Sequence, residues 1–309
     1  MKIFKPKFWG EKNHIMSFFL LPLSFVVQLF VIFKKKKIKQ EKFSIPVICI
    51  GNLYLGGTGK TPLSIEVCKI LKKRGKKVAI IKKFYRKHTD EFNLIESKKV
   101  KLFKNTSRVF AINKAVSKNF ECVVLDDGLQ DASINKSLSI VCFNSKQLIG
   151  NGMTLPSGPL REPFSSLKKS QIVVINGNKN TKFEKKIKNI SNAISIYYSN
   201  YYPHNLSRFK GKNLIAFAGI ANPENFFSLL KKNNLKVVKK VFFPDHYQYS
   251  LEELKKLINY SQKKNLELIT TEKDYFRIKH YKLTQINYLS VNLKIIHKKK
   301  FENEVVKYL

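Results

Sequence analysis

The sequence predicts an α/β protein with two lobes and a separate apolar segment near its N-terminus. Three observations predict this architecture. Apolar runs of four or five residues alternate with helical patterns, a glycine-rich turn joins the first run to a helix, and a polar, tyrosine-rich stretch at residues 197–212 interrupts the alternation as a candidate linker. Short apolar runs suit parallel strands that are covered on both faces. We expect residues 1–40 to form the apolar segment, 41–200 the first lobe and 201–309 the second, smaller lobe.

The N-terminal apolar segment covers residues 15–33 and contains no charged residue. A helix of about 19 such residues approaches the thickness of a bilayer core. Lysines flank it on both sides, and the run at residues 34–37 suits anionic lipid headgroups. Because Pro22, Ser24 and Gln28 interrupt the segment, we expect a membrane-associating helix that lies on or inserts into the cytoplasmic leaflet. A buried helix of the soluble core is the alternative.

The composition points to an anionic ligand. With 59 Lys and Arg against 21 Asp and Glu, the net charge is +38 at pH 7. Such a field attracts phosphates of nucleic acid, lipid or small substrates, although a compositional drift toward lysine would give the same excess. The four cysteines stand singly in apolar segments, without the spacing of a zinc site or redox pair. We therefore expect buried thiols in a reducing compartment.

The elements of the first lobe follow from its apolar runs. The expected strands cover residues 47–50, 78–81, 122–125, 139–143 and 172–175. A helical pattern at residues 62–74 separates the first two strands and ends at Gly75, a residue type favoured just beyond a helix.

The second lobe repeats the alternation. Its expected strands cover residues 214–218, 237–243, 266–270 and 286–291. Asn222 and Pro223 form a helix start, and residues 250–253 form a capping box that opens another helix. The lobes are therefore expected to be doubly wound.

Residues 51–62 read GNLYLGGTGKTP and follow the first strand directly. Glycines let backbone N–H groups turn toward an anion, and the helix N-terminus adds its dipole. A lysine here reaches the β- and γ-phosphates and a threonine holds Mg²⁺. Tyr54 stands where the strict pattern has glycine, so this is a variant loop. We predict a P-loop NTPase-like lobe with a nucleotide-binding loop of Tyr54, Leu55, Gly56, Gly57, Thr58, Gly59, Lys60 and Thr61.

Three further segments carry candidate chemistry. An apolar strand ends in Asp126 and Asp127, and Mg-nucleotide enzymes place a carboxylate at such an end. An Asp-Asp-Gly triplet alone is more often a turn, but a phosphate loop upstream favours the metal. Residues 150–163, GNGMTLPSGPLREP, form a Gly/Pro-rich loop with one Arg-Glu pair. His246 follows a strand of the second lobe, where a histidine is better placed for catalysis than for structure.

These segments together resemble the tetraacyldisaccharide 4′-kinase family, the lipid A 4′-kinases. The matching segments are GNLYLGGTGKTP (51–62), LDDGLQD (125–131), GNGMTLPSGPLREP (150–163), AGIANPENFF (218–227), FPDHYQYS (243–250) and TTEKD (270–274). They follow the family order across both lobes, and the apolar N-terminus resembles the family's membrane-associating helix. The resemblance implies transfer of the ATP γ-phosphate to the 4′-hydroxyl of a lipid-linked glucosamine disaccharide 1-phosphate. The product would be lipid IVA, at the cytoplasmic face of the bacterial inner membrane.

The resemblance also implies residue roles, with ATP and Mg²⁺ as cofactors. It places Gly56, Gly57, Gly59, Lys60 and Thr61 on the family's nucleotide loop. The implied metal-associated residues are Thr61, Asp126, Asp127 and Gln130. The implied catalytic residues are Asp90, His246, Lys60, Arg161 and Glu162. Of these, Asp90 and His246 match the family's catalytic dyad, and we expect this pair to bridge the lobes and accept the hydroxyl proton.

The sequence departs from the family pattern in three places. Residues 82–85 read Lys-Lys-Phe-Tyr where the family has Ser-Arg-Gly-Tyr, and Asp131 replaces a histidine. The segment around Asp90, residues 89–92, lacks the family's flanking glycine and proline. These changes concern the metal and acceptor side, so a weakened enzyme or a related acceptor stays open.

Other classes of function remain as alternatives. One is a membrane-bound P-loop ATPase of the partition or nucleic-acid-associated kind, but the lysine usual before two glycines in partition ATPases is Leu55 here. Basic residues are spread without a recognition helix, so we expect no specific nucleic-acid partner. Guanine readers separate Lys from Asp by one residue, whereas Lys273 and Asp274 are adjacent. A noncatalytic membrane scaffold with a nucleotide pocket is a further alternative, and the oligomeric state is not predicted.

Overall fold

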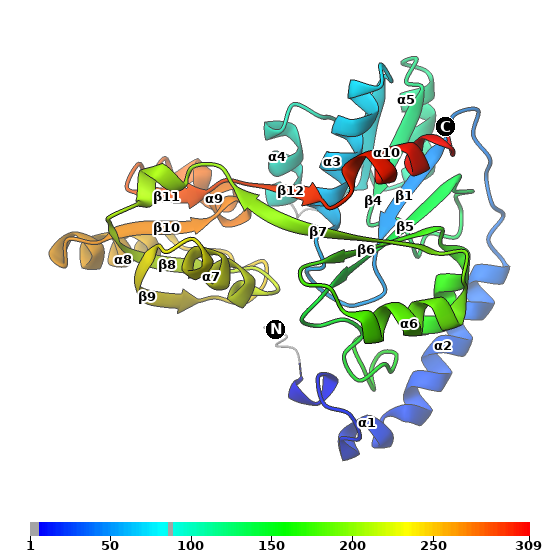
Figure 1. The fold of residues 1–309 in the computed structure, drawn as a ribbon, viewed down its shortest axis with the longest axis horizontal. Helices are drawn as coiled ribbons and strands as arrows, with labels where there is room; N and C mark the ends of the chain where they lie inside the picture. The colour runs from blue at the N-terminus through cyan, green and yellow to red at the C-terminus, as the bar shows by residue number, and fades with distance from the viewer. Residues whose placement is uncertain (1–5, 86–88) are drawn as a thin grey trace. The chain divides into compact units, whose positions relative to one another are not determined.

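The computed structural model describes residues 6–85 and 89–309, which form two compact units. The larger unit comprises residues 6–84, Val100–Asn200 and Leu293–Leu309, and the smaller unit comprises Tyr85–Lys99 and Tyr201–Asn292. Each unit contains one sheet (Figure 1). The expected α/β class with parallel sheets is confirmed.

The sheet of the larger unit has the order β12-β7-β6-β5-β1-β4-β2-β3, and its pairs from β7 to β3 are parallel. Its strands are β1 (Val47–Gly51), β2 (Val78–Lys83), β3 (Lys101–Asn105), β4 (Cys122–Asp126), β5 (Leu138–Asn144), β6 (Ile172–Asn176), β7 (Ser195–Pro203) and β12 (Val291–Ile295). The strands β1, β4, β5 and β6 are buried along their whole length. Such continuous burial explains their unbroken apolar runs.

Helices cover both faces of this sheet. They are α3 (Lys60–Lys73), α5 (Arg108–Val116), α6 (Thr181–Ile190) and α10 (Lys298–Val306), with short 3₁₀ helices η1 (Lys7–Trp9) and η2 (Phe164–Lys169). Ala111 of α5 and Phe183 of α6 belong to cores on one face of the sheet, and Phe301 of α10 packs against Tyr197 on the opposite face. The unit is therefore doubly wound, as expected.

The register of three strands determines what meets at the end of β1. Ile50 of β1 lies opposite Asp126 of β4, and Lys82 of β2 lies opposite the same Asp126. Because the carboxyl ends of parallel strands meet at one edge of a sheet, the glycine-rich loop, Asp126 and Lys82 come together there.

The smaller unit has a parallel sheet in the order β11-β10-β8-β9. Its strands are β8 (Asn213–Ala218), β9 (Lys236–Phe242), β10 (Glu267–Thr271) and β11 (Ile286–Leu289). Its helices are α4 (Thr89–Ser97), α7 (Pro223–Lys232), α8 (Leu251–Lys263), α9 (Glu272–Ile278), η3 (Leu206–Phe209) and η4 (Lys279–Tyr281). The cores on its two faces include Phe227 of α7 and Leu254 of α8, respectively. The capping box predicted at Ser250 is confirmed.

The unit boundaries differ from the expected ones at α4. We expected residues 41–200 to stay together, but Tyr85–Lys99 group with the smaller unit. The reason is that α4 packs against α9, with ion pairs from Asp90 to Arg277 and from Lys98 to Glu272. A helix inserted between two strands of one sheet thus belongs to the other unit.

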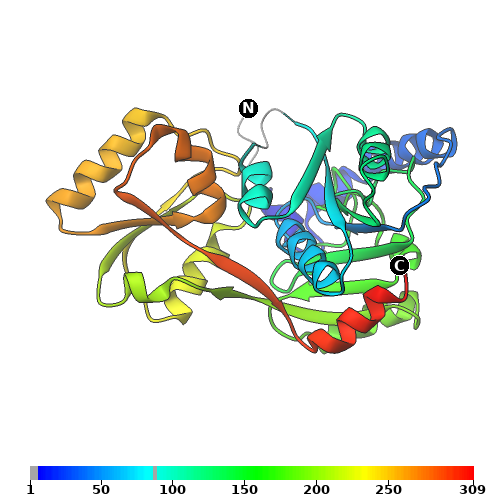
Figure 2. The same cartoon turned by 90° about the horizontal axis from the view of Figure 1, so that it is seen from above.

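The boundaries also differ near the C-terminus, where Leu293–Leu309 join the larger unit rather than the second lobe. Here β12 lies beside β7 in the sheet (Figure 2), and Phe301 of α10 packs edge-on against Tyr197. The linker predicted at residues 197–212 is wrong in its first part, because β7 continues to Pro203. Tyrosine-rich sequence is polar in appearance but has high strand propensity.

The N-terminal segment forms α1 (Ile15–Phe19) and α2 (Leu21–Lys36). In both helices a polar side chain is buried while most apolar side chains are exposed. Its buried side chains are Ser17 and Ser24. Its exposed apolar side chains are Ile15, Met16, Phe18, Phe19, Leu21, Leu23, Phe25, Val26, Leu29, Phe30, Ile32 and Phe33. The alternative of a buried core helix is therefore wrong. In the part of the chain that the structure describes, no helix combines the length and apolarity needed to cross a membrane.

Candidate active site

The glycine-rich loop turns between β1 and α3, and hydrogen bonds from a buried asparagine stabilise its shape. The buried Asn52 donates from Nδ2 to the carbonyl oxygens of Tyr54, at 2.5 Å, and Gly56, at 3.1 Å. Gly56 and Gly59 have φ values of 127° and 98°, which only glycine adopts readily. Helix α3 then begins at Lys60, so its first N–H groups open toward the loop. The loop has the strand–turn–helix arrangement that the sequence predicted.

The Gly/Pro-rich loop is tied to this turn through its backbone. Leu55 N donates to Pro159 O at 2.8 Å, and Arg161 N donates to Leu53 O at 2.7 Å. The side chain of Arg161 consequently lies 3.0 Å from Asp127 Oδ1, measured from Nη1. The structure thus brings Arg161 to the predicted acids.

Glu162, the other member of the Arg-Glu pair, has a different partner. Its Oε1 lies 2.8 Å from Lys35 Nζ at the end of α2. The carboxylate therefore connects this loop to the N-terminal helix, whereas Arg161 faces Asp127.

Asp126 is fully buried, and both of its carboxylate oxygens contact protein groups. Its Oδ2 accepts from Thr61 Oγ1 at 2.9 Å and lies 2.5 Å from Lys82 Nζ. Its Oδ1 accepts from Ser64 Oγ at 3.1 Å. Lys82, known from the sequence only as a departure from the family pattern, is thus the counter-ion of this acid.

Asp127 is more open, with 29% of its side chain exposed and a φ of 59°. Its Oδ1 lies 3.7 Å from Lys60 Nζ and 3.0 Å from Arg161. Burial disfavours the charged carboxylate, but Lys60 and Arg161 outweigh burial and hold the pKa of Asp127 below its ordinary value. Burial, in turn, lowers the pKa of Lys60, and Asp127 partly offsets this.

Two residues that follow Asp127 brace the site. Gln130 Nε2 donates to Asn52 O at 3.0 Å, and Gln130 Oε1 lies 3.3 Å from Arg161 Nη1. Asp131 pairs with Arg108 at 3.0 Å, and the same guanidinium donates to Asp127 O at 2.7 Å. Arg108 therefore compensates the negative charge of Asp131 and also binds the backbone of Asp127.

The donor set suits Mg²⁺ bound mainly through phosphates. The described residues contain no group of three or more His, Cys, Asp or Glu that could hold a metal alone. Mg²⁺ commonly uses one or two carboxylates, substrate phosphates and water. Thr61 supplies a hydroxyl, and Asp127 has one carboxylate oxygen, Oδ2, without a hydrogen bond or ion pair among the described residues. The metal roles of Asp126 and Gln130 stay predictions.

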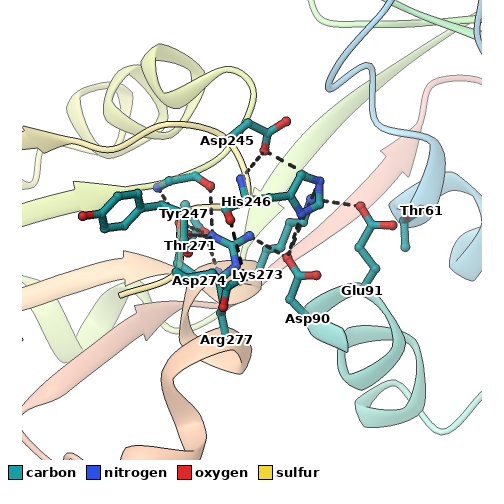
Figure 3. A network of polar contacts seen from close by, with 12 residues as sticks. Thr61, Asp90, Glu91, Asp245, His246, Tyr247, Thr271, Lys273, Asp274 and Arg277 are labelled. Atoms are coloured by element: carbon teal, nitrogen blue, oxygen red, sulfur yellow. Dashed lines mark hydrogen bonds and ion pairs between the residues drawn. The ribbon is translucent and has the colours of Figure 1, made fainter. Parts of the chain in front are cut away.

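A second polar centre lies in the smaller unit, where Asp90 of α4 meets three side chains (Figure 3). Asp90 Oδ2 lies 2.5 Å from Arg277 Nη2, 3.7 Å from His246 Nδ1 and 3.9 Å from Lys273 Nζ. Only 1% of the Asp90 side chain is exposed, and its Oδ1 is buried without a hydrogen bond from the described residues. The structure therefore confirms that Asp90 and His246 are neighbours, but both belong to the smaller unit. The expectation that the pair bridges two lobes is wrong.

Arg277 anchors this centre, and the sequence patterns did not predict its role. Its side chain is 3% exposed and bridges Asp90 to Asp274, whose Oδ1 lies 2.8 Å from Arg277 Nη1. Asp274 also accepts hydrogen bonds from Gly219 N and Thr271 Oγ1. Its position in the sequence could have indicated this role, because Arg277 lies one helical turn after Asp274, the acid of the TTEKD segment.

The surroundings of His246 favour its neutral form. Burial and the nearby Lys273 ammonium lower the pKa of His246, and Asp245 and Asp90 oppose them only in part. Lys273 Nζ lies 3.4 Å from His246 Nε2 and 2.9 Å from Glu91 Oε1 (Figure 3). The acids outweigh burial at Lys273 and raise the pKa of its ammonium. A neutral imidazole beside a carboxylate is suited to taking part in proton transfer.

Comparisons with known proteins identify related sequences. The family model for tetraacyldisaccharide-1-P 4'-kinase matches residues 16–309. A tetraacyldisaccharide 4'-kinase from Pelagibacter ubique is 43% identical over 99% of this chain and 98% of its own length. One from Rickettsia bellii is 31% identical over 90% of each chain.

A solved structure shows the same fold. The crystal structure of LpxK from Aquifex aeolicus in complex with ATP has a TM-score of 0.72 and 22% sequence identity, and it covers 95% of this chain and 99% of its own. Because the family model and the relatives extend over both units, the chain belongs to the tetraacyldisaccharide-1-P 4'-kinase family.

Proposed function

We propose that this protein transfers the γ-phosphate of ATP to the 4′-hydroxyl of tetraacyldisaccharide 1-phosphate, which forms lipid IVA. As a family member the chain is a kinase, and ATP is its phosphoryl donor. The observation that carries the proposal is the 43% identity over 99% of the chain to a protein of that name. The alternatives of a partition-like or nucleic-acid-associated ATPase are not favoured by this membership.

In the proposed mechanism the larger unit holds the donor. Backbone N–H groups of the glycine-rich loop and the Lys60 ammonium bind the β- and γ-phosphates. Thr61 and Asp127 would hold Mg²⁺, which supplies positive charge to the phosphoryl oxygens. Arg161 lies 3.0 Å from Asp127 and adds a further positive charge at this place. Phosphoryl transfer depends mainly on such positioning and charge stabilisation.

The smaller unit supplies the proton acceptor. Asp90 Oδ1 is the carboxylate oxygen that accepts no hydrogen bond from the described residues, so it is the atom proposed to receive the hydroxyl proton. Arg277 holds the other oxygen at 2.5 Å and orients the carboxylate. His246 supports Asp90 as the neutral member of the dyad.

The test is transfer of radiolabel from γ-labelled ATP to the purified disaccharide acceptor in detergent micelles. We expect a labelled product whose phosphate is released by a monoester-specific phosphatase. Lys60→Met should abolish the product, and Lys256→Met, at an exposed site on α8, should not. Binding of Mg-ATP without any labelled lipid from the wild-type chain would contradict the proposal.

We further propose that α1 and α2 lie on the cytoplasmic face of the inner membrane. Support comes from the exposed apolar residues of both helices and from the lysines at the end of α2. Support also comes from the inward polar contacts, since Ser24 Oγ donates to Ser157 Oγ at 2.8 Å and Asn151 Nδ2 donates to Ser17 Oγ at 3.0 Å.

Flotation with vesicles that contain anionic lipid tests this placement. Replacing Phe25, Phe30 and Phe33 together with serine should release the protein, because these rings are 60–68% exposed. The control is Val238→Ser, at an exposed apolar residue of β9. Equal flotation of both variants would rule out α2 as the anchor.

A further inference from the structure

The two adjacent acids at the glycine-rich loop are not equivalent. Asp126 has no exposed surface and contacts Thr61, Ser64 and Lys82 through both carboxylate oxygens. Asp127 contacts cations through Oδ1 alone and keeps Oδ2 without such a partner among the described residues. Only one of the two carboxylates is thus open to a further cation.

Lys82 causes this difference. It is the last but one residue of β2, directly opposite Asp126 in the parallel register, and its side chain is 6% exposed. A buried ammonium requires a negative partner, because removing it from water costs more free energy than contacts with neutral groups recover. Asp126 Oδ2, at 2.5 Å, is such a partner.

The charges around the two acids favour an incoming anion. The cationic groups are Lys60, Lys82, Arg108 and Arg161, and the acidic groups are Asp126, Asp127 and Asp131. The protein groups therefore leave one positive charge before any metal binds. A bare divalent cation meets a site that is already positive, whereas a metal–triphosphate complex, which is anionic, does not.

We infer that Lys82 is the resident cation of Asp126 and a determinant of metal binding, which leaves Asp127 as the metal-facing acid. This inference rests on the proposed use of Mg-ATP at the loop. Lys82 withholds a second carboxylate from the metal, so the protein binds a free divalent cation weakly and receives the metal together with the nucleotide. Removing the ammonium frees Asp126, and two adjacent carboxylates then attract the metal directly.

The experiment measures Mn²⁺ binding to the full-length protein in detergent, without nucleotide, from the electron paramagnetic resonance signal of free Mn²⁺. Lys82→Met should bind Mn²⁺ at least tenfold more tightly than the wild-type chain. The matched control, Lys83→Met, removes the same charge at the neighbouring position, where the side chain points to the opposite face of the strand, and should change the affinity less than threefold.

A double variant separates the proposed cause from a general loss of positive charge. Adding Asp126→Asn to Lys82→Met removes the freed carboxylate, so the Mn²⁺ affinity should return to the wild-type value. Lys82→Arg keeps the cation and should also bind like the wild-type chain. Thermal melting establishes that each variant is folded. If Lys82→Met alone does not fold, Lys82→Arg and the double variant still test the inference, because both leave the net charge of the site unchanged.

Two results would overturn the inference. One is equal Mn²⁺ affinity of Lys82→Met and Lys83→Met, and the other is tight binding that persists in the double variant. Neither depends on phosphorylation of the lipid acceptor. Failure of the proposed function would appear instead as a wild-type chain that binds no Mg-ATP or labels no acceptor.

Discussion

The larger and the smaller unit each contain a buried aspartate with a cation at 2.5 Å, and the two sites differ in what the second oxygen does. Asp126 pairs with Lys82, and its other oxygen accepts from Ser64. Asp90 pairs with Arg277, and its other oxygen accepts nothing from the described residues. The same kind of ion pair thus produces a structural acid in one unit and, in the other, an acid with a buried oxygen that accepts no hydrogen bond from the described residues.

The two cations also differ in how they are held. The Lys82 ammonium is a point charge beside Asp126, whereas the planar guanidinium of Arg277 bridges Asp90 and Asp274. Arg277 therefore orients Asp90 as well as neutralising it. A base that must meet a substrate hydroxyl in one geometry benefits from such orientation.

The largest expected effect concerns Asp90 and its oxygen without a hydrogen bond. Asp90→Asn keeps the shape but removes the proton acceptor, so kcat should fall by about 10²–10⁴-fold while ATP binding is unchanged. The radiolabel assay and titration with a fluorescent ATP analogue measure the two quantities. Asp245→Asn, at a partly exposed acid beside His246, is the control. If Asp90→Asn kept full turnover, Asp90 would not be the base.

Removing the bridging cation should affect stability most. Arg277→Met leaves the buried Asp274 without its counter-ion and leaves Asp90 with only the more distant Lys273, which should lower the free energy of unfolding by about 3–5 kcal/mol. Denaturant unfolding measures this loss. Lys256→Met, at an exposed ion pair of α8, should cost about 0–1 kcal/mol. Equal effects of the two substitutions would show that Arg277 is not an anchor.

The pH dependence of turnover tests the neutral histidine. Because the pKa of His246 is lowered, the imidazole is neutral above that lowered value, and kcat should decline only as the pH falls below the ordinary value of 6.5. Lys273→Met removes a cation that lowers this pKa, while Asp90, Glu91 and Asp245 remain. The acidic decline should consequently move to higher pH. A decline that stays in place or moves to lower pH would contradict the role of Lys273.

The smallest expected effect comes from making Asp126 resemble Asp90. Ser64→Ala removes the donor to Asp126 Oδ1 and leaves that buried oxygen without its partner. The free energy of unfolding should fall by about 1–3 kcal/mol, as measured with denaturant. Ser166→Ala is the control, because the buried Ser166 hydroxyl has no hydrogen bond to lose among the described residues. A Ser64→Ala protein as stable as this control would show that Asp126 does not need the hydroxyl.

Local sequence patterns were sufficient for much of the larger unit. The five apolar runs predicted the strands that they form, because a parallel strand buried on both faces is apolar at every position. The glycine-rich loop and the two acids were also predictable, because their chemistry depends on residues close together in the chain. Elements with mixed polarity were missed, and β7 is one example, since its buried residues Tyr197, Ser199 and Pro203 stand among partly buried and exposed ones.

The amino-acid sequence by itself determined the family, the phosphate loop, the acids that follow it and the neighbouring pair of Asp90 and His246. Only the tertiary structure decided which cation serves each acid and to which unit each residue belongs. Lys82 and Asp126 are 44 residues apart in the chain, and Asp90 and Arg277 are 187 apart. The physical reason is that strand register and helix packing bring such distant residues together, and no local pattern encodes a buried ion pair between them.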